Sequence, residues 1–214
     1  MSLVRVHNLA VSLDGFATGE DRSVEAPFGH AGMRLMEWFK DTATWAALQG
    51  VPDAPPTPDD AFARGSFEGI GVEIMGAGKF GPPGWQDDAR WRGWWGEDPP
   101  FHTPVIVLTH RPREPLTLGD TTFLFRAAAP AEALAEARGL AGSLDVRVGG
   151  GPTSVRAFLA ADLVDYLHVV VVPVVLGRGV RLWDGLEGLE ERFETAATST
   201  PSGVTHVRFA RRGR

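Results

Sequence analysis

Two glycine-rich turns in this sequence have the chemistry needed to hold a phosphate group. The candidate residues are Gly76, Gly78 and Lys79 in the first turn and Gly149, Gly150, Gly151, Thr153 and Ser154 in the second. Glycine lets backbone N–H groups approach a ligand closely, and the N-terminus of a following helix presents unpaired N–H groups and a positive partial charge. The turns therefore predict an anion site to which the lysine adds a cation. The alternative is that the glycines only form tight turns.

The first turn, GAGKFG at residues 76–81, also has the GxGxxG spacing of a dinucleotide-binding turn. A Rossmann turn follows the first strand and has an acidic residue about 20 positions later, at the tip of the next strand. Here the turn follows a later strand, and the tip of the next strand carries Thr109, His110 and Arg111 instead of an acidic residue. Both differences argue against a Rossmann fold. A P-loop is excluded because Glu73 stands where its first glycine is required. The basic tip suits a 2′-phosphate, since a guanidinium forms paired hydrogen bonds with phosphate, which favours NADP over NAD.

Asp14 is the candidate catalytic residue. It lies with Gly15 at the end of the alternating segment 4–11, which predicts a strand that enters a loop. Its carboxylate has the chemistry to bind or protonate a substrate nitrogen, although Asp-Gly pairs are also common turn formers. Trp94 and Trp95 in the aromatic segment 81–103 are candidates to stack on a heteroaromatic substrate. Their alternative role is to close a core or a dimer surface.

The amino-acid composition of the chain limits the kinds of ligand and macromolecule that it is expected to bind. The chain of 214 residues has a net charge of -6 and no cysteine. Phosphate-backbone binding needs a basic stripe that this chain lacks, so nucleic acid is not expected. Thiolate nucleophiles and cysteine-ligated zinc are excluded. The longest apolar run is far short of the roughly 20 residues that span a bilayer, and the N-terminus lacks a signal-peptide pattern. We expect a soluble cytoplasmic protein without a membrane partner. We expect no metal site, because solvated or satisfied roles suit the scattered histidines His7, His30, His102, His168 and His206.

Hydrophobic periodicity predicts the elements that position these residues. Strands are expected at 4–11, 72–75, 105–109, 121–125, 145–148 and 167–175, helices at 30–48, from 59 or 60 to 69, at 130–142 and at 153–161, and a hairpin at 193–200 and 204–211. Pro173 is expected to interrupt its strand. Strands and helices alternate in the middle while the end is antiparallel, which predicts an α/β fold with a mixed sheet.

These segments together resemble the dihydrofolate reductase-like superfamily. The similarity is to the branch that contains the reductase domain of the riboflavin-biosynthesis deaminase-reductase. The matching segments are AVSLDGFATG at 10–19, IMGAGKFG at 74–81, PVIVLTHRP at 104–112, VRVGGGPTSVRAFLAADLVDYLHVVVVPVVLGRG at 146–179, and the terminal hairpin. They span nearly the whole chain in the expected order. The triple glycine and the helix after it are the most specific part.

The resemblance implies a single domain, residues 1–214, around a mostly parallel mixed sheet of about eight strands flanked by helices. It also implies bound NADPH and a homodimer joined through sheet edges. By position, Gly76, Lys79, Thr109, His110 and Arg111 would surround the adenosine phosphates, residues 149–153 would hold the pyrophosphate, and Asn8, Asp14 and Gly15 would face the nicotinamide and the substrate. Ala77 departs from the family, which often carries arginine there, so Lys79 would have to substitute. Residues 20–70 form an insertion relative to a minimal reductase.

The expected function is therefore an NADPH-dependent reductase of a small heterocyclic, imine or carbonyl substrate. A pterin or ribosylaminopyrimidine is implied by the resemblance alone. The cysteine-rich zinc motif of the deaminase half is missing, so any role in that pathway would be reduction. Two alternatives stay open: a non-catalytic nucleotide-binding dimer, and a flavin-dependent reductase that uses the same cleft.

Overall fold

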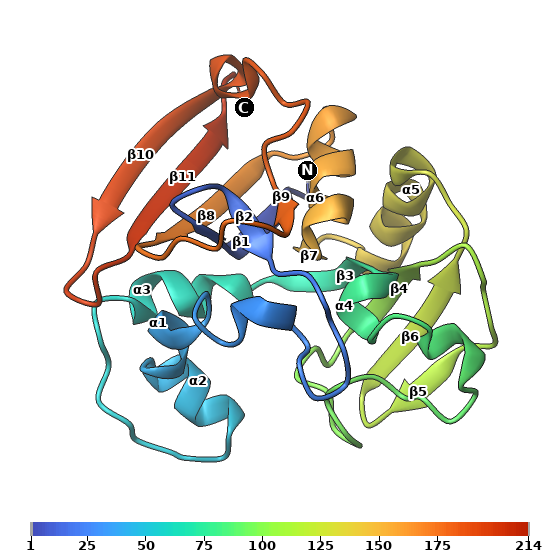
Figure 1. Ribbon diagram of the computed structural model, residues 1–214. Helices are drawn as coiled ribbons and strands as arrows, with labels where there is room; N and C mark the ends of the chain where they lie inside the picture. The colour runs from blue at the N-terminus through green and yellow to red at the C-terminus, as the bar shows by residue number, and fades with distance from the viewer. Residues whose placement is uncertain (1, 214) are drawn as a thin grey trace.

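The computed structural model describes residues 2–213, which form one large sheet with layers on both faces (Figure 1). Within these residues, the sheet has nine strands in the order β10-β11-β8-β1-β7-β3-β4-β6-β5. The strands are β1 (Val4–Ser12), β3 (Ile70–Gly76), β4 (Pro104–Leu108), β5 (Leu116–Leu118), β6 (Thr121–Arg126), β7 (Asp145–Gly150), β8 (Tyr166–Val172), β10 (Phe193–Ser199) and β11 (Thr205–Arg211). Neighbours from β8 to β6 are parallel, whereas β11, β10 and β5 pair antiparallel. A separate pair joins β2 (Phe16–Thr18) to β9 (Val180–Arg181).

The mostly parallel α/β sheet and the antiparallel terminal hairpin are confirmed. The expected count of eight strands is wrong, because β5 adds a three-residue strand at the sheet edge. Three residues are too few to show an alternating pattern. The strand expected at 167–175 ends at Val172, just before Pro173. Proline has no N–H to donate to the ladder, so the sequence located this break correctly.

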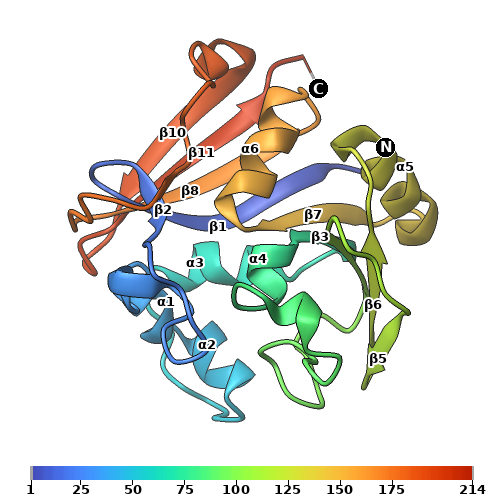
Figure 2. The same cartoon turned by 45° about the vertical axis from the view of Figure 1, so that its right-hand side comes forward.

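The first face of the sheet is covered by α5 (Pro130–Ala141) and α6 (Pro152–Ala160), which lie above it in Figure 2. Both helices begin with proline, which suits a position whose N–H would be unpaired. The Glu132 side chain accepts a hydrogen bond of 2.9 Å from the N–H of Ala129 and so caps α5. Ala137 and Phe158 are completely buried against the strands. This face is a continuous apolar core.

The second face is covered by short helices and loops, which lie below the sheet in Figure 2. The helices are α1 (Glu37–Lys40), α2 (Ala43–Leu48), α3 (Asp60–Ala63) and α4 (Ala77–Phe80). The single helix expected at 30–48 is wrong. The hydroxyl oxygen of Thr42 accepts a hydrogen bond from the N–H of Trp45 and begins α2 as a separate helix. In the part of the chain described, no helix combines the length and the apolar character that crossing a bilayer requires.

Two tryptophans fasten the aromatic segment 81–103 to α4. The Trp85 indole N–H donates to the carbonyl of Ala77 at 3.0 Å, and the Trp91 indole donates to the carbonyl of Phe80 at 3.1 Å. Phe80 itself is completely buried in an apolar cluster under β3, β4 and β6. The segment is a loop, as the sequence indicated, apart from a short 3-10 turn at Trp85–Asp87. Its indoles therefore hold the first glycine turn against the sheet.

Candidate functional site

The predicted cofactor turns meet at one edge of the sheet. Strands β7, β3 and β4 are parallel neighbours, with Met75 opposite Gly150 and Gly76 opposite Leu108. Their carboxyl ends therefore lie side by side. The first glycine turn, the triple-glycine turn and the tip that begins at Thr109 are brought together, although up to about 75 residues separate them in the chain.

The triple-glycine turn leaves the N-terminus of α6 open. A Cβ atom placed on Gly151 would have no atom within 4 Å, and Gly150 has a φ of 119°, a conformation that favours glycine. Thr153 is exposed and Ser154 is half-buried. A Cβ on Gly76 would lie 2.2 Å from the hydroxyl oxygen of Ser154, so the two glycine turns are in close contact. Open backbone at a helix N-terminus fits a phosphate group.

Lys79 is not free beside its turn. Its ammonium group lies 2.6 Å from Glu73 Oε1 and 2.9 Å from the carbonyl oxygen of Gly149. The other oxygen of Glu73 accepts from Arg147 Nε at 2.6 Å, and Arg147 also donates to the carbonyl of Ser66 at 2.7 Å. The side chain of Glu73 is 1 % exposed. The half-buried lysine is therefore part of a triad in which two cations flank one buried anion.

The two neighbouring cations favour the ionised form of Glu73. Burial raises the pKa of Glu73, but Arg147 and Lys79 lower it more, so its pKa lies below the usual value. Burial lowers the pKa of Lys79, and Glu73 offsets part of that effect. The Arg147 guanidinium lies 5.0 Å from the ring centroid of Phe67, and the Lys79 ammonium lies 5.5 Å from that of Phe101. The triad thus contacts an aromatic ring at each end.

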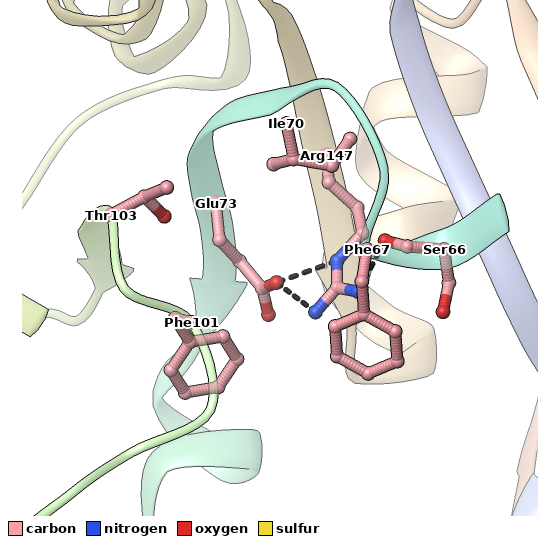
Figure 3. A pocket seen from close by; sticks show the side chains of 7 residues that line it. All are labelled: Ser66, Phe67, Ile70, Glu73, Phe101, Thr103 and Arg147. Carbon is pink, nitrogen blue, oxygen red and sulfur yellow. Dashed lines mark hydrogen bonds and ion pairs between the residues drawn. The ribbon is translucent and has the colours of Figure 1, made fainter. Parts of the chain in front are cut away.

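A small cavity adjoins the triad. Figure 3 shows Glu73 and Arg147 meeting between the rings of Phe101 and Phe67. Its volume is about 20 Å³, which is room for about one water molecule. Because Phe67 belongs to the insertion and Phe101 to the aromatic loop, the cavity lies where the two covers of the second face meet.

The basic tip after β4 is paired with an acid. Arg111 Nη2 lies 2.7 Å from Asp87 Oδ1, and both side chains are exposed. Asp87 raises the pKa of Arg111 by hydrogen bonding and by its charge. Thr109 is buried and its hydroxyl oxygen accepts from the N–H of Arg111 at 3.2 Å, whereas His110 is exposed. An exposed pair of this kind is weak enough for a phosphate to replace the carboxylate.

Arg22 was not a candidate from the sequence. Its guanidinium group donates to the carbonyl of Gly78, and its Nε donates to the carbonyl of Pro27 at 2.8 Å. It brings a cation from the insertion to the first glycine turn, where Ala77 provides none. No local pattern marked it, because residues 20–30 lack a regular period.

The carboxylate of Asp14 accepts hydrogen bonds that hold a turn. Its carboxylate accepts from the Ser12 hydroxyl at 2.6 Å and from the N–H groups of Leu176 and Gly177 at 3.1 and 2.7 Å. The bond from Ser12 is the main cause that lowers the pKa of Asp14 to about 2. Gly15 follows with a φ of 85°. This geometry favours the turn-forming alternative, and a catalytic role for Asp14 stays a prediction.

The two candidate tryptophans pack with other aromatic residues. Trp95 stacks on Phe123, with ring centroids 5.9 Å apart and planes 14° apart. Trp94 meets Trp91 edge to face at 4.8 Å. Both are half-buried, and Trp95 belongs to the apolar cluster under β3, β4 and β6. Stacking on a substrate stays a prediction for both.

Asn8 lies at a β-bulge. The pairing of β1 with β8 shifts between Val6 and Leu9, so His7 and Asn8 together face His168. Asn8 has a φ of 57°, which is uncommon for a residue other than glycine. Its Nδ2 donates to the carbonyl of Ala63 at 3.4 Å. Bulges and strained backbone of this kind are frequent beside active sites.

A chain of buried polar residues lies next to this bulge. Asp59 Oδ1 is 2.8 Å from His206 Nε2, and His206 Nδ1 is 3.0 Å from His168 Nε2. The two histidines are completely buried. Both histidines thus take part in hydrogen bonds, which is one of the two roles expected for them, but the sequence did not predict that they meet. Residues 59, 168 and 206 are far apart in the sequence, so no local spacing indicated the group.

The sequence matches one known family over nearly its full length. The RibD C-terminal domain family matches residues 6–206. No curated protein matches the sequence. The solved structures that match are distant in sequence and show the fold.

A putative riboflavin biosynthesis protein from Shewanella sp. PV-4 is 19% identical, with 99% of each chain covered and a TM-score of 0.56. The deaminase and 5-amino-6-(5-phosphoribosylamino)uracil reductase of Thermotoga maritima is 13% identical with a TM-score of 0.55, and the match covers 98% of this chain but 56% of that one. Dihydrofolate reductase from Enterococcus faecalis, complexed with NADP(H) and RAB-propyl, is 14% identical, with 99% and 96% covered and a TM-score of 0.54. These likenesses confirm the dihydrofolate reductase-like fold.

Proposed function

The chain belongs to the RibD C-terminal domain family, and from this premise we propose that it is an NADPH-dependent reductase of a small heterocyclic, imine or carbonyl substrate. Family membership and the reductase-like fold support an oxidoreductase of the riboflavin-pathway type. A pterin or a ribosylaminopyrimidine is the proposed kind of substrate. The observation that carries the proposal is the meeting of two glycine turns and a basic strand tip at the carboxyl edge of the sheet.

The residues at this edge fit the phosphates of a dinucleotide. The open backbone of residues 150–151 and the free N–H groups of Thr153 and Ser154 would hold the pyrophosphate. The exposed Arg111 would leave Asp87 to bind the 2′-phosphate. Arg22 would supply the cation that Ala77 lacks, because the ammonium of Lys79 is already bonded to Glu73. When bound, the nicotinamide supplies a hydride, and the protein orients the reacting carbons.

A direct binding measurement tests whether the protein binds NADPH. Calorimetry with NADPH and NADH should give tighter binding of NADPH, because Arg111 and His110 stand at the tip assigned to the 2′-phosphate. Gly151→Ala should weaken NADPH binding by roughly tenfold, because its methyl group would occupy the space left for the ligand. The stability of this variant should change little, since no atom lies within 4 Å of the added Cβ.

Gly139→Ala on α5 is the matched control, because a Cβ there also meets no atom within 4 Å and Gly139 lies outside both glycine turns. It should leave NADPH affinity unchanged. Absence of binding to either nucleotide would refute the proposal. Tight binding without oxidation of NADPH by any pterin, aminopyrimidine or imine would favour the non-catalytic nucleotide-binding alternative, and a yellow purified protein would favour the flavin-dependent one.

The proposal includes a homodimer joined through sheet edges. The outer strand β10 is seven residues long, and all but its first residue are exposed. An unpaired strand edge is a template for pairing with another chain. Sedimentation equilibrium should give twice the 23.1 kDa mass of the chain.

A further inference from the structure

The triple-glycine turn begins at a bulge, and a lysine from another segment binds its backbone there. In the part of the chain that the structure describes, the pairing of β7 with β3 shifts just before Met75, so Gly150 has a partner on β3 and Gly149 has none. The extra residue of a bulge is left out of the regular ladder. Lys79 Nζ donates to the carbonyl oxygen of Gly149 at 2.9 Å. The lysine therefore holds the backbone where the strand becomes the turn.

A bond to this carbonyl also orients the first amide group of the turn. The C=O of Gly149 and the N–H of Gly150 belong to one planar peptide unit, so they cannot rotate independently. The next residue, Gly151, is the open position where a Cβ would meet no atom within 4 Å. Consecutive glycines restrict their own backbone less than other residues do. The bond from Lys79 thus supplies a restraint that the turn itself lacks.

The side chains of the triad pack directly on this backbone. A Cβ on Gly149 would lie 2.1 Å from Glu73 Oε1 and 2.7 Å from Lys79 Nζ. A Cβ on Gly150 would lie 3.7 Å from Lys79 Cδ. The lysine side chain therefore runs along two residues of the turn, with its ammonium against the first and a methylene group against the second. Such a close approach is possible because both residues are glycine.

Lys79 is itself held in place. Its ammonium lies 2.6 Å from Glu73 Oε1 and 5.5 Å from the ring centroid of Phe101. Its helix, α4, is fastened by the two indole hydrogen bonds described above. Because the bonds to Glu73 and Gly149 engage two of the three N–H donors of the ammonium, the lysine is arranged to support the turn.

We propose that Lys79 is a positioning residue for the cofactor: it holds the carbonyl of Gly149 and thereby orients the open backbone that receives the pyrophosphate, without touching the phosphate itself. This inference rests on the proposed function and adds a residue to that same site. Glu73 acts one step further away, because it holds the ammonium. Cofactor affinity should therefore depend on a side chain that the cofactor does not contact.

The two cations of the triad provide a matched pair of variants. Lys79→Met removes the bond to the turn and leaves Glu73 paired with Arg147. Arg147→Met removes the bond to the insertion and leaves Glu73 paired with Lys79. In calorimetry, Lys79→Met should weaken NADPH binding by roughly tenfold and Arg147→Met by less than about threefold. Equal losses of affinity would overturn the inference, because both variants break one ion pair of the triad.

Lys40 controls for the loss of a positive charge. It is the other lysine of the chain and lies on α1, where it pairs with Glu37 at 3.1 Å. Lys40→Met should leave NADPH affinity unchanged. A loss equal to that of Lys79→Met would show that net charge alone governs binding, and would contradict a positioning role.

The absence of cysteine from the chain allows the ammonium to be restored chemically. In Lys79→Cys, the thiolate displaces bromide from bromoethylamine and gains an ammonium at the length of the lysine side chain. Propyl bromide gives a neutral chain of the same length. With complete labelling verified by mass, the first adduct should regain most of the NADPH affinity and the second should not. Equal affinities of the two adducts would refute the role of the ammonium.

Glu73→Gln distinguishes positioning from direct contact with the phosphate. If the ammonium holds the turn, loss of its charged partner should weaken NADPH binding several-fold. If the ammonium instead bound the phosphate, its release from Glu73 would strengthen NADPH binding, and that result would overturn the inference.

The turn can also be observed without the cofactor. In NMR spectra of the cofactor-free protein, Lys79→Met should shift the amide signals of Gly150 and Gly151 more than Arg147→Met does. NADPH binding that Lys79→Met leaves intact refutes this inference alone. Absence of NADPH binding to the wild-type protein refutes the proposed function, and the amide signals then decide whether the lysine holds the turn.

Discussion

The two faces of the sheet are built on different principles. The face under α5 and α6 is apolar throughout, with Val148, Val155 and Phe158 completely buried. The opposite face carries Glu73 and Arg147 in its middle, between two separate apolar clusters. The same strands supply both faces, because successive side chains of a strand point in opposite directions.

The apolar face contributes stability, whereas the charged groups of the second face determine which segments lie beside one another. Apolar burial on the first face has no direction and tolerates many arrangements of similar volume. A buried charge requires a partner at hydrogen-bond distance, so it fixes the neighbours that provide one. On the second face the triad contacts the cofactor turn through Gly149 and the insertion through Ser66. The triad thus connects the triple-glycine turn to the insertion.

The largest expected effect comes from removing the anion of the triad. Glu73→Leu leaves the buried Arg147 and the half-buried Lys79 without their counter-ion and should lower the free energy of unfolding by about 3–5 kcal/mol. Arg147→Met should cost less, because the neutral pair of Glu73 and Lys79 remains. Urea unfolding at neutral pH measures both.

A partly exposed ion pair between β6 and α5 is the control for this prediction. Arg126 and Glu136 are about one third exposed and contact each other at 2.9 Å. Glu136→Leu should lower the free energy of unfolding by less than about 1 kcal/mol, because solvent screens the pair. Equal losses for Glu73→Leu and Glu136→Leu would show that the polar interior contributes no more than a surface contact.

A smaller effect is expected from a methyl group at the contact between the triad and the cofactor turn. A Cβ on Gly149 would lie 2.1 Å from Glu73 Oε1 and 2.7 Å from Lys79 Nζ. Gly149→Ala should therefore destabilise the protein by about 1–3 kcal/mol through overpacking, measured by thermal unfolding. Gly139→Ala on the first face should be neutral or stabilise by up to about 1 kcal/mol, because alanine favours a helix interior. A gain at both positions would contradict the tight contact.

The last expected effect concerns pH, and it changes the unfolding free energy only below about pH 6.5. The pKa of His168 is about 3 in the folded protein, because of burial, and 6.5 as the ordinary value. The unfolded chain therefore binds more protons between these values, so this contribution is complete above pH 6.5 and is lost as pH falls toward 3. Replacing His168 by Gln should flatten the decline in unfolding free energy between pH 6 and 4 by up to about 1.4 kcal/mol per pH unit.

A variant on the apolar face provides the contrast in the same experiment. Phe158→Leu should lower the unfolding free energy at every pH and leave its slope unchanged, because no ionisable group is removed. A His168→Gln slope that matches the wild type would mean that this histidine is solvated in the folded protein.

Local sequence patterns predicted the elements of the first face and the positions of the two glycine turns. The helices that begin at Pro130 and Pro152, the terminal hairpin and the break before Pro173 were all located, because each depends on neighbours within a few residues. The glycine turns were predicted on the same basis. Their meeting at one sheet edge followed from the resemblance, and the parallel strand order confirms it.

The sequence could not predict the covers of the second face. The expected helix 30–48 divides because its apolar residues pack on the sheet from short turns instead of along one helical stripe. Lys79 was predicted to supply a cation to a phosphate, and the sequence did not predict that its ammonium is bonded to Glu73. Arg22 reaches Gly78 from a segment without a period. In each case the partner is distant in the sequence.

The sequence by itself determined which segments become strands, where the glycine turns fall and which family the chain belongs to, since periodicity, turn residues and motif order are local properties. Tertiary structure alone decided that Glu73 lies between Lys79 and Arg147 and that Asp59 reaches His168 through His206. The reason is physical: strand order and the path of the insertion place these side chains within 3 Å of their partners, and charges and hydrogen bonds act only at such distances.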